Sequence, residues 1–379
     1  MKTMNRFFIV LVILFSSVFT ETLSAQAVQS ESTMNFTGRI QNLGLVEMQG
    51  DEIETNFLVR RARLKFEGVT ISPKFKYKVE LGLTNRDHGS PIPQTKNSAR
   101  MILDAVVQYE ICANTHLWFG QTKLPGNRER VISSSKLQFV DRSLLNSNYN
   151  IDRDMGFQLH QKFDVGNMKA KAIVSISQGE GRNITTGNDG GFDYTGRVEL
   201  LPFGAFSSKG DYFGSDLKRE AEPKLALGLT YDYNDQASRE RGNTGSFLSQ
   251  TRTLSTIFAD MMFKYNGFSV MAEYAMKSSD ESPVFVDEVD GLEYNFTTGS
   301  ALNFQVGYLL QSDWELAARY TSVTPEYIQA EDDVSMYTLG ISKYIDGHNL
   351  KVQSDFSMVL EGQMEETYLA RLQFELSFN

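Results

Sequence analysis

Six basic residues alternate with apolar ones in two consecutive segments. Residues 55–67 contain Arg61, Arg63 and Lys65, and residues 73–85 contain Lys74, Lys76 and Lys78. Because strand side chains alternate between two faces, a hairpin would place all six cations on one face. The opposite face would hold Leu58, Ala62, Leu64 and Phe66. Like charges about 7 Å apart repel by about 0.6 kcal/mol in water and by more at lower dielectric constant. The row therefore favours a surface that attracts anions; a solvated face with Glu67 and Glu80 as counterions is the alternative.

A second group of cations lies in residues 124–154 and beside them. It combines hydroxyl donors with positive charge: Lys123, Arg128, Arg130, Ser133, Ser134, Ser135, Lys136, Arg142 and Arg153. An oxyanion that loses water needs such charge-assisted hydrogen bonds. Apolar residues are interleaved with them, among them Leu137, Phe139 and Leu145. The segment is therefore expected to fold against a wall and narrow a pore, although a surface loop with incidental charges remains the alternative.

The elements that must hold these residues are short segments with period-two alternation. We expect strands at residues 35–47, 55–67, 73–85, 100–112, 115–123, 155–164, 168–178, 192–201, 224–234, 253–265, 268–277, 299–310, 313–321, 334–345, 349–360 and 367–378. In the last of them Leu372, Phe374 and Leu376 share one face, and Arg371, Gln373 and Glu375 share the other. A strand that is apolar outward and polar inward is what a lipid-embedded barrel requires.

The connections between these segments also differ in length. Short links at 68–72, 113–114, 165–167, 266–267, 311–312 and 346–348 interleave with long ones at 86–99, 124–154, 179–191, 235–252, 278–298 and 322–333. Residues 1–25 read as a secretory signal with a cleavage site after Ala25 or Ala27. Residues 26–379 are therefore predicted to form an all-β fold, a 16-stranded antiparallel transmembrane β-barrel. A large secreted β-sandwich or propeller is the alternative.

Composition excludes several other classes. The formal net charge is −10, and removing Lys2, Arg6 and Glu21 with the signal makes it −11. Much of the acid falls in expected loops, such as residues 280–290, 331–333 and 361–366. Cys112 is the single cysteine, so no intramolecular disulfide and no cysteine-rich metal site can form. No Gly-X-Ser-X-Gly motif is present. We expect no enzyme activity, no cofactor, no metal site and no nucleic-acid partner.

Four runs resemble a known family. They are FLVRRARLKFEG, ILDAVVQYEI, LWFGQTKLPGNRERVISSSKLQFVDRSLL and RDMGFQL. They look like the phosphate-selective porin O/P family of Gram-negative bacteria, particularly its Bacteroidetes-type members. The resemblance covers residues 55–160 by motif and the rest by strand pattern. It implies a trimeric 16-stranded outer-membrane barrel whose third extracellular loop folds inward as a constriction.

The resemblance also implies roles for single residues. Arg61 and Arg63 would belong to a basic track on the wall. Lys136 and Arg142 would form the constriction, with Ser134 and Ser135 as neutral donors. The sequence has Asp141-Arg142-Ser143 where the family pattern has Glu-Arg-Ser.

These observations together predict a passive outer-membrane porin. Small anions such as phosphate or pyrophosphate would permeate, and lipid and lipopolysaccharide would surround a homotrimer. A general or carbohydrate-permeating porin is one alternative, with Phe139, Tyr149 and Phe157 as a stacking slide. A non-conducting structural or adhesin barrel is the other.

Overall fold

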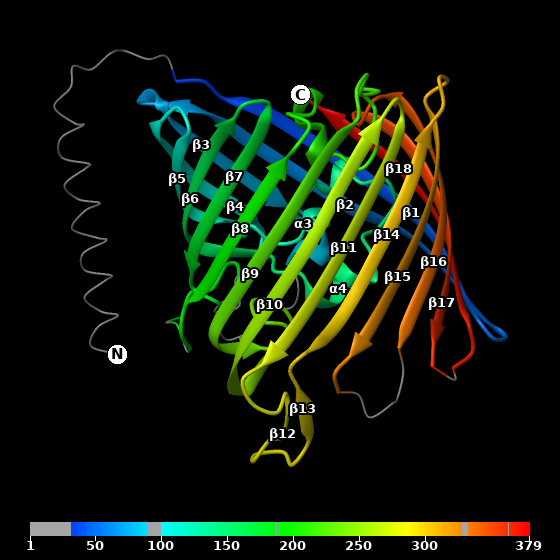
Figure 1. The fold of residues 1–379 in the computed structure, drawn as a ribbon. Helices are drawn as coiled ribbons and strands as arrows, with labels where there is room; N and C mark the ends of the chain where they lie inside the picture. The colour runs from blue at the N-terminus through cyan, green and yellow to red at the C-terminus, as the bar shows by residue number, and fades with distance from the viewer. Residues whose placement is uncertain (1–31, 89–99, 187, 189, 328–332, 363) are drawn as a thin grey trace.

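The chain folds into a closed antiparallel barrel, seen from the side in Figure 1. The computed structural model describes residues 32–88, 100–186, 188, 190–327, 333–362 and 364–379, and sixteen strands in these ranges close the barrel. The predicted fold class is therefore confirmed. The predicted signal peptide, residues 1–25, lies outside the described residues.

The strands follow one another around the barrel in chain order. They are β1 (Asn35–Gln49), β2 (Glu52–Thr70), β3 (Ser72–Gly82), β4 (Ile102–Cys112), β5 (Thr115–Lys123), β6 (Arg153–Val165), β7 (Met168–Ser177), β8 (Asp193–Leu201), β9 (Lys224–Arg239), β10 (Phe247–Tyr265), β11 (Phe268–Ser279), β14 (Gly299–Leu309), β15 (Trp314–Pro325), β16 (Val334–Asp346), β17 (Leu350–Glu361) and β18 (Thr367–Phe378). A small separate sheet, β12 (Val284–Val286) with β13 (Glu293–Asn295), lies in the connection between β11 and β14. Strand β18 pairs with β1 and closes the ring. None of the helices in the described ranges is long and apolar enough to cross a membrane.

The two faces of the wall differ as the alternation predicts. On β18, Leu372 is 57% exposed and Phe374 is 44% exposed, whereas Gln373 and Glu375 are buried inside the barrel. The outer face is therefore suited to lipid and the inner face to polar contacts. The same alternation recurs on β14 and β15, where outward Phe304 and Leu316 are exposed and Gln305 and Glu315 are buried.

One end of the barrel has the long connections, including residues 124–152, between β5 and β6, which are the third connection at this end. The start of β1, the end of β18 and most of the short turns lie at the other end, whereas the two-residue turn between β1 and β2 lies at the long-loop end. Residues 202–223, between β8 and β9, form a long connection at the short-turn end and contain the 3-10 helix η3 (Ser207–Tyr212). The predicted lists of short and long links omitted this connection.

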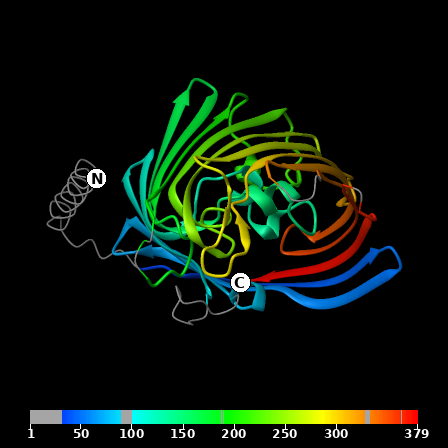
Figure 2. The same ribbon diagram turned by 90° about the horizontal axis from the view of Figure 1, so that it is seen from below.

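The connection of residues 124–152 lies inside the barrel, and we call it the inner loop. It contains α3 (Arg128–Val131), the 3-10 helix η2 (Ser134–Lys136) and α4 (Leu144–Tyr149). Figure 2 looks along the barrel from the long-loop end and shows the loop in teal within the ring of strands.

Apolar packing holds the inner loop against one side of the wall. Leu145, Tyr149 and Ile151 pack on Phe258, Ala275 and Ala301, which belong to β10, β11 and β14. Ile132 and Leu137 pack with Ala226, Met262 and Met271, and with Phe206 of the 202–223 connection. Burying apolar surface at about 25 cal/mol per Å² stabilises this arrangement. The β9–β15 side of the lumen is therefore filled, and space remains toward β1–β6.

Close packing inside the filled side makes a testable prediction at Gly228 on β9. A Cβ atom there would lie 2.4 Å from both Arg197 Nη2 and Asp260 Oδ1, which form an ion pair. Gly228→Ala should lower barrel stability by about 1–3 kcal/mol because a well-packed interior does not accept added volume. The midpoint of urea unfolding, monitored by the gel mobility of the folded barrel, measures this change in stability. The matched control is Gly196→Ala on β8, where no heavy atom lies within 4 Å of the added Cβ; equal midpoints for the two variants would contradict the prediction.

Candidate functional site

A β-bulge in β2 brings two adjacent arginines onto the luminal face. Gln41 of β1 pairs with Arg61, but the next residue, Asn42, pairs with Val59, so Arg60 is the extra residue. Arg60 forms an ion pair with Asp141 of the inner loop, and Arg61 Nη1 donates to Gln41 Oε1 at 2.7 Å. A bulge leaves one residue unpaired and redirects a side chain. The side chains of two adjacent cations, Arg60 and Arg61, therefore both point into the lumen at the bulge.

The bulge also corrects the predicted apolar face of this strand. Alternation without interruption placed Leu58 with Ala62, Leu64 and Phe66. The inserted residue shifts the pattern by one, so Phe57 and Val59 point outward and are 90% and 53% exposed. Leu58 pairs with the buried Leu43 instead.

Four other cations of the hairpin, Arg63, Lys65, Lys76 and Lys78, have acidic partners. Lys65 Nζ lies 2.8 Å from Glu67 Oε1, and Lys78 Nζ lies 2.8 Å from Asp104 Oδ2. Arg63 contacts Glu80 and Asp87 at 3.4 and 3.0 Å. Toward the short-turn end, Lys76 Nζ lies 3.9 Å from Glu110 Oε2. The hairpin is therefore a row of cations with acidic side chains interleaved. Its net charge is less positive than the sequence pattern alone indicated.

The tip of the inner loop crosses the lumen and contacts the far strands. Val140 N donates to Asp355 Oδ2 of β17 at 3.0 Å, and Arg319 Nη1 of β15 donates to the Asp141 carbonyl at 2.8 Å. Arg371 of β18 lies 3.7 Å from Asp141 Oδ2. On β1, Arg39 Nη2 donates to Ser134 Oγ at 2.9 Å. The tip therefore bridges the strands on both sides of the β1–β18 closure.

Serine residues shape the loop locally. Ser133 caps η2, and Ser143 caps α4 by accepting from Asn146 N at 3.2 Å. A hydroxyl at this position satisfies a backbone N–H that the helix leaves free. Ser143 Oγ also donates to Glu129 Oε2 at 2.5 Å, which ties α4 to α3.

Arg128 anchors the base of the loop. Its Nε atom lies 2.7 Å from Asp260 Oδ1, its Nη1 atom donates to the Asp211 carbonyl at 3.1 Å, and its side chain is fully buried. Arg197 shares Asp260 at 2.7 Å. A buried ion pair is costly to break because one charge is left without a partner. The structure thus places Arg128 in the attachment of the loop to the wall.

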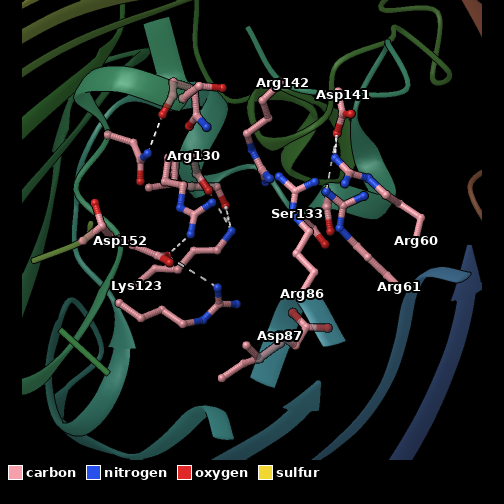
Figure 3. Close-up of a pocket in the computed structure, with 18 of the residues that line it drawn as sticks. Arg60, Arg61, Arg86, Asp87, Lys123, Arg130, Ser133, Asp141, Arg142 and Asp152 are labelled. Carbon is pink, nitrogen blue, oxygen red and sulfur yellow. Dashed lines mark hydrogen bonds and ion pairs between the residues drawn. The ribbon is translucent and has the colours of Figure 1, made fainter. Parts of the chain in front are cut away.

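Between the inner loop and the β2–β6 wall lies a cavity of about 690 Å³, which we call the arginine cavity. Its lining includes twelve basic side chains: Arg60, Arg61, Arg63, Lys78, Arg86, Lys123, Arg130, Arg142, Arg153, Arg182, Arg241 and Arg371. Four acidic side chains also line it: Glu80, Asp87, Asp141 and Asp152. In Figure 3, Arg60 and Arg61 reach Asp141 on one side, Lys123, Arg130 and Asp152 lie on the other, and Arg142 lies between them.

The cavity joins the two groups of residues that the sequence singled out, but only in part. The predicted residues that line it are Arg61, Arg63, Lys78, Lys123, Arg130, Ser134 and Arg142. The predicted residues that do not line it are Lys65, Lys74, Lys76, Arg128, Ser135 and Lys136. Arg153, which belongs to the second group of cations, also lines it. Sequence reasoning did not assign Arg60, Arg86, Arg182, Arg241 and Arg371 to the site. The adjacent pair Arg60-Arg61, which interrupts the alternation, was the signal available for the bulge.

Lys136 and Arg142 lie on different sides of the inner loop. Lys136 Nζ is 3.9 Å from the centre of the Phe213 ring and lines another cavity, of about 490 Å³, with Lys264 and His348 near the short-turn end. Burial lowers the pKa of Lys136, and Lys65 adds to this. The two residues were expected together in one constriction, and the structure separates them.

Lys123 serves mainly to position the loop. Its Nζ atom donates to the carbonyl oxygens of Arg130, Val131 and Ile132 at 2.7, 3.3 and 3.2 Å. An ammonium has three N–H donors, and these three contacts use all of them. Its charge still borders the arginine cavity.

Several cavity arginines keep unused hydrogen-bond donors. In the described part of the chain, Arg60 Nε, Arg63 Nε, Arg130 Nε, Arg182 Nη1 and Arg241 Nε have no hydrogen-bond partner. A buried donor without a partner costs free energy, about 1–3 kcal/mol for a neutral group and more for a charged one. An anion with several oxygen atoms would supply acceptors for such groups.

The charges of the loop residues are fixed at neutral pH. Burial lowers the pKa of Arg142 to about 9, with Arg130 acting in the same direction, so Arg142 remains a cation. Burial alone would raise the pKa of Asp141, but Arg60, Arg61 and Arg371 lower it overall. Asp152 has its pKa lowered in the same way by Arg130 and Arg153. In the lining of the cavity, basic side chains therefore outnumber acidic ones by eight.

The carboxylate of Asp141 offers a direct test of this balance. Asp141→Asn removes one of four negative charges while retaining the shape of the side chain, and frees Arg60 and Arg61 for another anion. We expect phosphate to bind about three- to tenfold more tightly, because the competing charge is lost in a site of reduced dielectric constant. Blockade of chloride current by phosphate measures the change. Glu67→Gln, outside the cavity on β2, is the matched control; equal effects of the two variants would contradict the role given to Asp141.

Comparison with known proteins places these observations in a family. The family model for phosphate-selective porin O and P matches residues 34–368. No curated protein matches the chain. An anion-selective porin from Comamonas acidovorans has a similar structure, with a TM-score of 0.57 and 10% identity over 92% of this chain and 100% of that one. The outer-membrane channel DcaP of Acinetobacter baumannii matches with a TM-score of 0.57 and 12% identity over 92% and 99%.

A third solved structure is a loop-deletion mutant of OmpT, an outer-membrane protein of Vibrio cholerae. It matches with a TM-score of 0.58 and 11% identity over 92% of this chain and 100% of that one. At such identities the structures share the fold, a barrel of the Gram-negative outer membrane. In the described residues, no cluster of three or more histidine, cysteine, aspartate or glutamate side chains is arranged to hold a metal ion. The barrel, its inner loop and the match over nearly the whole chain show that this protein is an outer-membrane channel of the phosphate-selective porin O and P family.

Proposed function

We propose that this protein is a passive channel that prefers small oxyanions such as phosphate and pyrophosphate. The observation that supports this most directly is the arginine cavity, where twelve basic side chains face four acidic ones beside the inner loop. The chain as a whole has a net charge of −10, so the positive charge is concentrated locally. A pore lined by one sign of charge with low-dielectric walls raises the local concentration of the opposite ion.

The cavity contains groups that attract an anion and groups that compete with the anion and so allow it to leave. Arg61, Arg63 and Lys78 present charge from the wall, and Arg130, Arg142 and Ser134 present charge and a hydroxyl from the loop side. Guanidinium groups bind oxyanions by paired hydrogen bonds that replace lost water. Asp141 and Asp152 compete for the same arginines. Conduction needs binding that favours entry and still permits exit, and these carboxylates supply the competition.

The descriptions of the matched family and of one similar structure agree with this proposal. The matched family is described as phosphate-selective, and one similar structure is that of an anion-selective porin. Another is a trimer form of OmpT from Vibrio cholerae. We propose a homotrimer for this chain too, with the exposed apolar outer face in contact with outer-membrane lipid and lipopolysaccharide.

Recordings in planar lipid bilayers test the proposal. A potassium chloride gradient should give a reversal potential of the sign expected for chloride, and millimolar phosphate should reduce the chloride current. A cation-type reversal potential would overturn the anion preference. An intact chloride current in millimolar phosphate would overturn the phosphate preference alone. Absence of any conductance from the purified trimer would favour a structural barrel.

The aromatic residues that a carbohydrate-permeating porin was expected to use for stacking are not available in the lumen. Tyr149 and Phe139 are buried against the wall by loop packing, with 0% and 3% exposure. Phe157 stacks on Phe119, which is exposed on the outer face. Maltose or glucose should therefore leave the chloride current unchanged at concentrations where phosphate reduces it.

A further inference from the structure

A second, smaller cavity adjoins the arginine cavity. It has a volume of about 210 Å³, and its lining shares Lys78, Lys123 and Val131 with the arginine cavity. Three of its lining side chains have rings, Trp118, His160 and Tyr212, and we call it the aromatic cavity. The arginine cavity has no ring side chain in its described lining. The two adjoining spaces therefore offer different chemistry.

The rings of the aromatic cavity are held in place by their neighbours. Trp118 on β5 stacks on His160 on β6, with ring centroids 4.2 Å apart and planes inclined by 28°. Tyr212 comes from the opposite direction, at the end of η3 in the 202–223 connection. Its hydroxyl donates to Glu199 Oε2 at 2.5 Å. The apolar side chains of Leu124, Val131 and Ile173 complete the lining. A flat apolar group in this cavity would therefore contact aromatic rings and aliphatic side chains that are already in position.

Positive charge also borders this space. Lys171 Nζ donates to the Tyr212 hydroxyl at 3.0 Å and lies 5.3 Å from the centre of that ring. Lys78 and Lys123 stand where the two cavities meet. Glu199 is the one acidic residue in the described lining. Small-molecule sites often pair an apolar surface with a few charged groups that fix orientation.

We propose that the two cavities together bind a phosphate monoester whose phosphoryl group is attached to a flat aromatic ring. The ring occupies the aromatic cavity beside Trp118, and the phosphoryl group lies beside Lys78, where the two cavities meet, and faces the arginine cavity. The space is sufficient, because a cavity of about 150 Å³ admits a benzene ring. An aromatic ring can stack on an aromatic side chain, which a saturated ring cannot do. This inference rests on the proposed anion channel and names a class of anion that the channel would favour.

Current blockade by three related anions tests the proposal. Inorganic phosphate, cyclohexyl phosphate and phenyl phosphate are compared on the wild-type channel. Phenyl phosphate should bind about fivefold to tenfold more tightly than cyclohexyl phosphate, which has similar bulk but no π face. In Trp118→Leu this excess should disappear, while the blockade by inorganic phosphate changes by less than twofold. Equal affinities for the two esters in the wild type, or an excess that survives in Trp118→Leu, would overturn the proposal.

The same series separates this inference from the proposed function. If the channel does not favour phosphate at all, inorganic phosphate will fail to block the wild type. If only the present inference fails, inorganic phosphate will still block it. Trp314→Leu is the matched control, because Trp314 is on the outer face of β15 and is 42% exposed. It should leave all three affinities at wild-type values.

Fluorescence supplies a test whose main variant, Trp314→Phe, leaves the lining of the cavity unchanged. The chain contains two tryptophans, Trp118 and Trp314. In Trp314→Phe all tryptophan emission comes from Trp118, and 4-nitrophenyl phosphate should quench it along a saturable curve that inorganic phosphate displaces. In Trp118→Phe the remaining emission should show only linear, collisional quenching. Linear quenching in both variants would overturn the placement of the ring.

Discussion

Arg128→Met should raise the single-channel conductance about twofold or more and make the open current noisy. Arg128 holds the base of the inner loop to Asp260 and to the 202–223 connection through the Asp211 carbonyl. Removing one partner of a buried ion pair costs up to about 3–5 kcal/mol. Asp260 keeps Arg197 as a partner, so the loss falls mainly on the attachment of the loop. A loop that is released from β10 would leave the lumen part of the time, and ions would pass through a wider opening.

Arg130→Met is the matched control for this prediction. Arg130 lies two residues away, has the same charge and lines the arginine cavity with a free Nε atom. Its loss should weaken phosphate blockade at nearly unchanged conductance. The pair therefore separates a residue that attaches the loop from one that faces the permeating ion. Wild-type conductance and noise in Arg128→Met would show that Arg128 does not anchor the loop.

Exchanging Arg61 and Arg63 together for glutamate should move the reversal potential strongly toward the cation side and weaken phosphate blockade by at least tenfold. Both residues line the arginine cavity. Each charge acts on an anion about 7 Å away with about 2 kcal/mol at an effective dielectric constant of 20. The double variant changes the sign of two such terms, so a large effect is expected.

The same hairpin provides the control for this second prediction. Lys74→Glu with Lys76→Glu makes an identical change in charge near the short-turn end, outside the lining of the arginine cavity. The reversal potential of this variant should move only slightly, because exposed charges are screened over about 8 Å at physiological ionic strength. Equal shifts in the two double variants would indicate that total luminal charge, rather than the cavity, determines selectivity.

The sequence was sufficient to predict the barrel because each strand has to face lipid and water at once. The segments expected at 115–123 and 367–378 coincide with β5 and β18, and the largest differences are at β9, which ends at Arg239, and β10, which begins at Phe247. Apolar residues such as Leu137 and Leu145 also indicated that the inner loop packs inside, and the structure buries both.

The composition of the cavity was less predictable, for two physical reasons. The bulge at Arg60 depends on pairing with β1, which the alternation of β2 alone does not encode. The direction of each loop side chain depends on the fold of the loop, so Lys136 and Arg142, six positions apart, face different cavities. Arg371 and Arg182 reach the cavity from distant segments. Long-range contacts of this kind leave no spacing signal in one sequence.

The bridge between the inner loop and the β1–β18 closure has a consequence for biogenesis. Ser134 accepts from Arg39 of the first strand, and Asp141 lies beside Arg371 of the last. These two strands are neighbours only when both ends of the chain have met. The arginine cavity therefore acquires its final lining only when β1 and β18 have paired, and an intermediate with an open seam cannot discriminate among ions as the finished channel does.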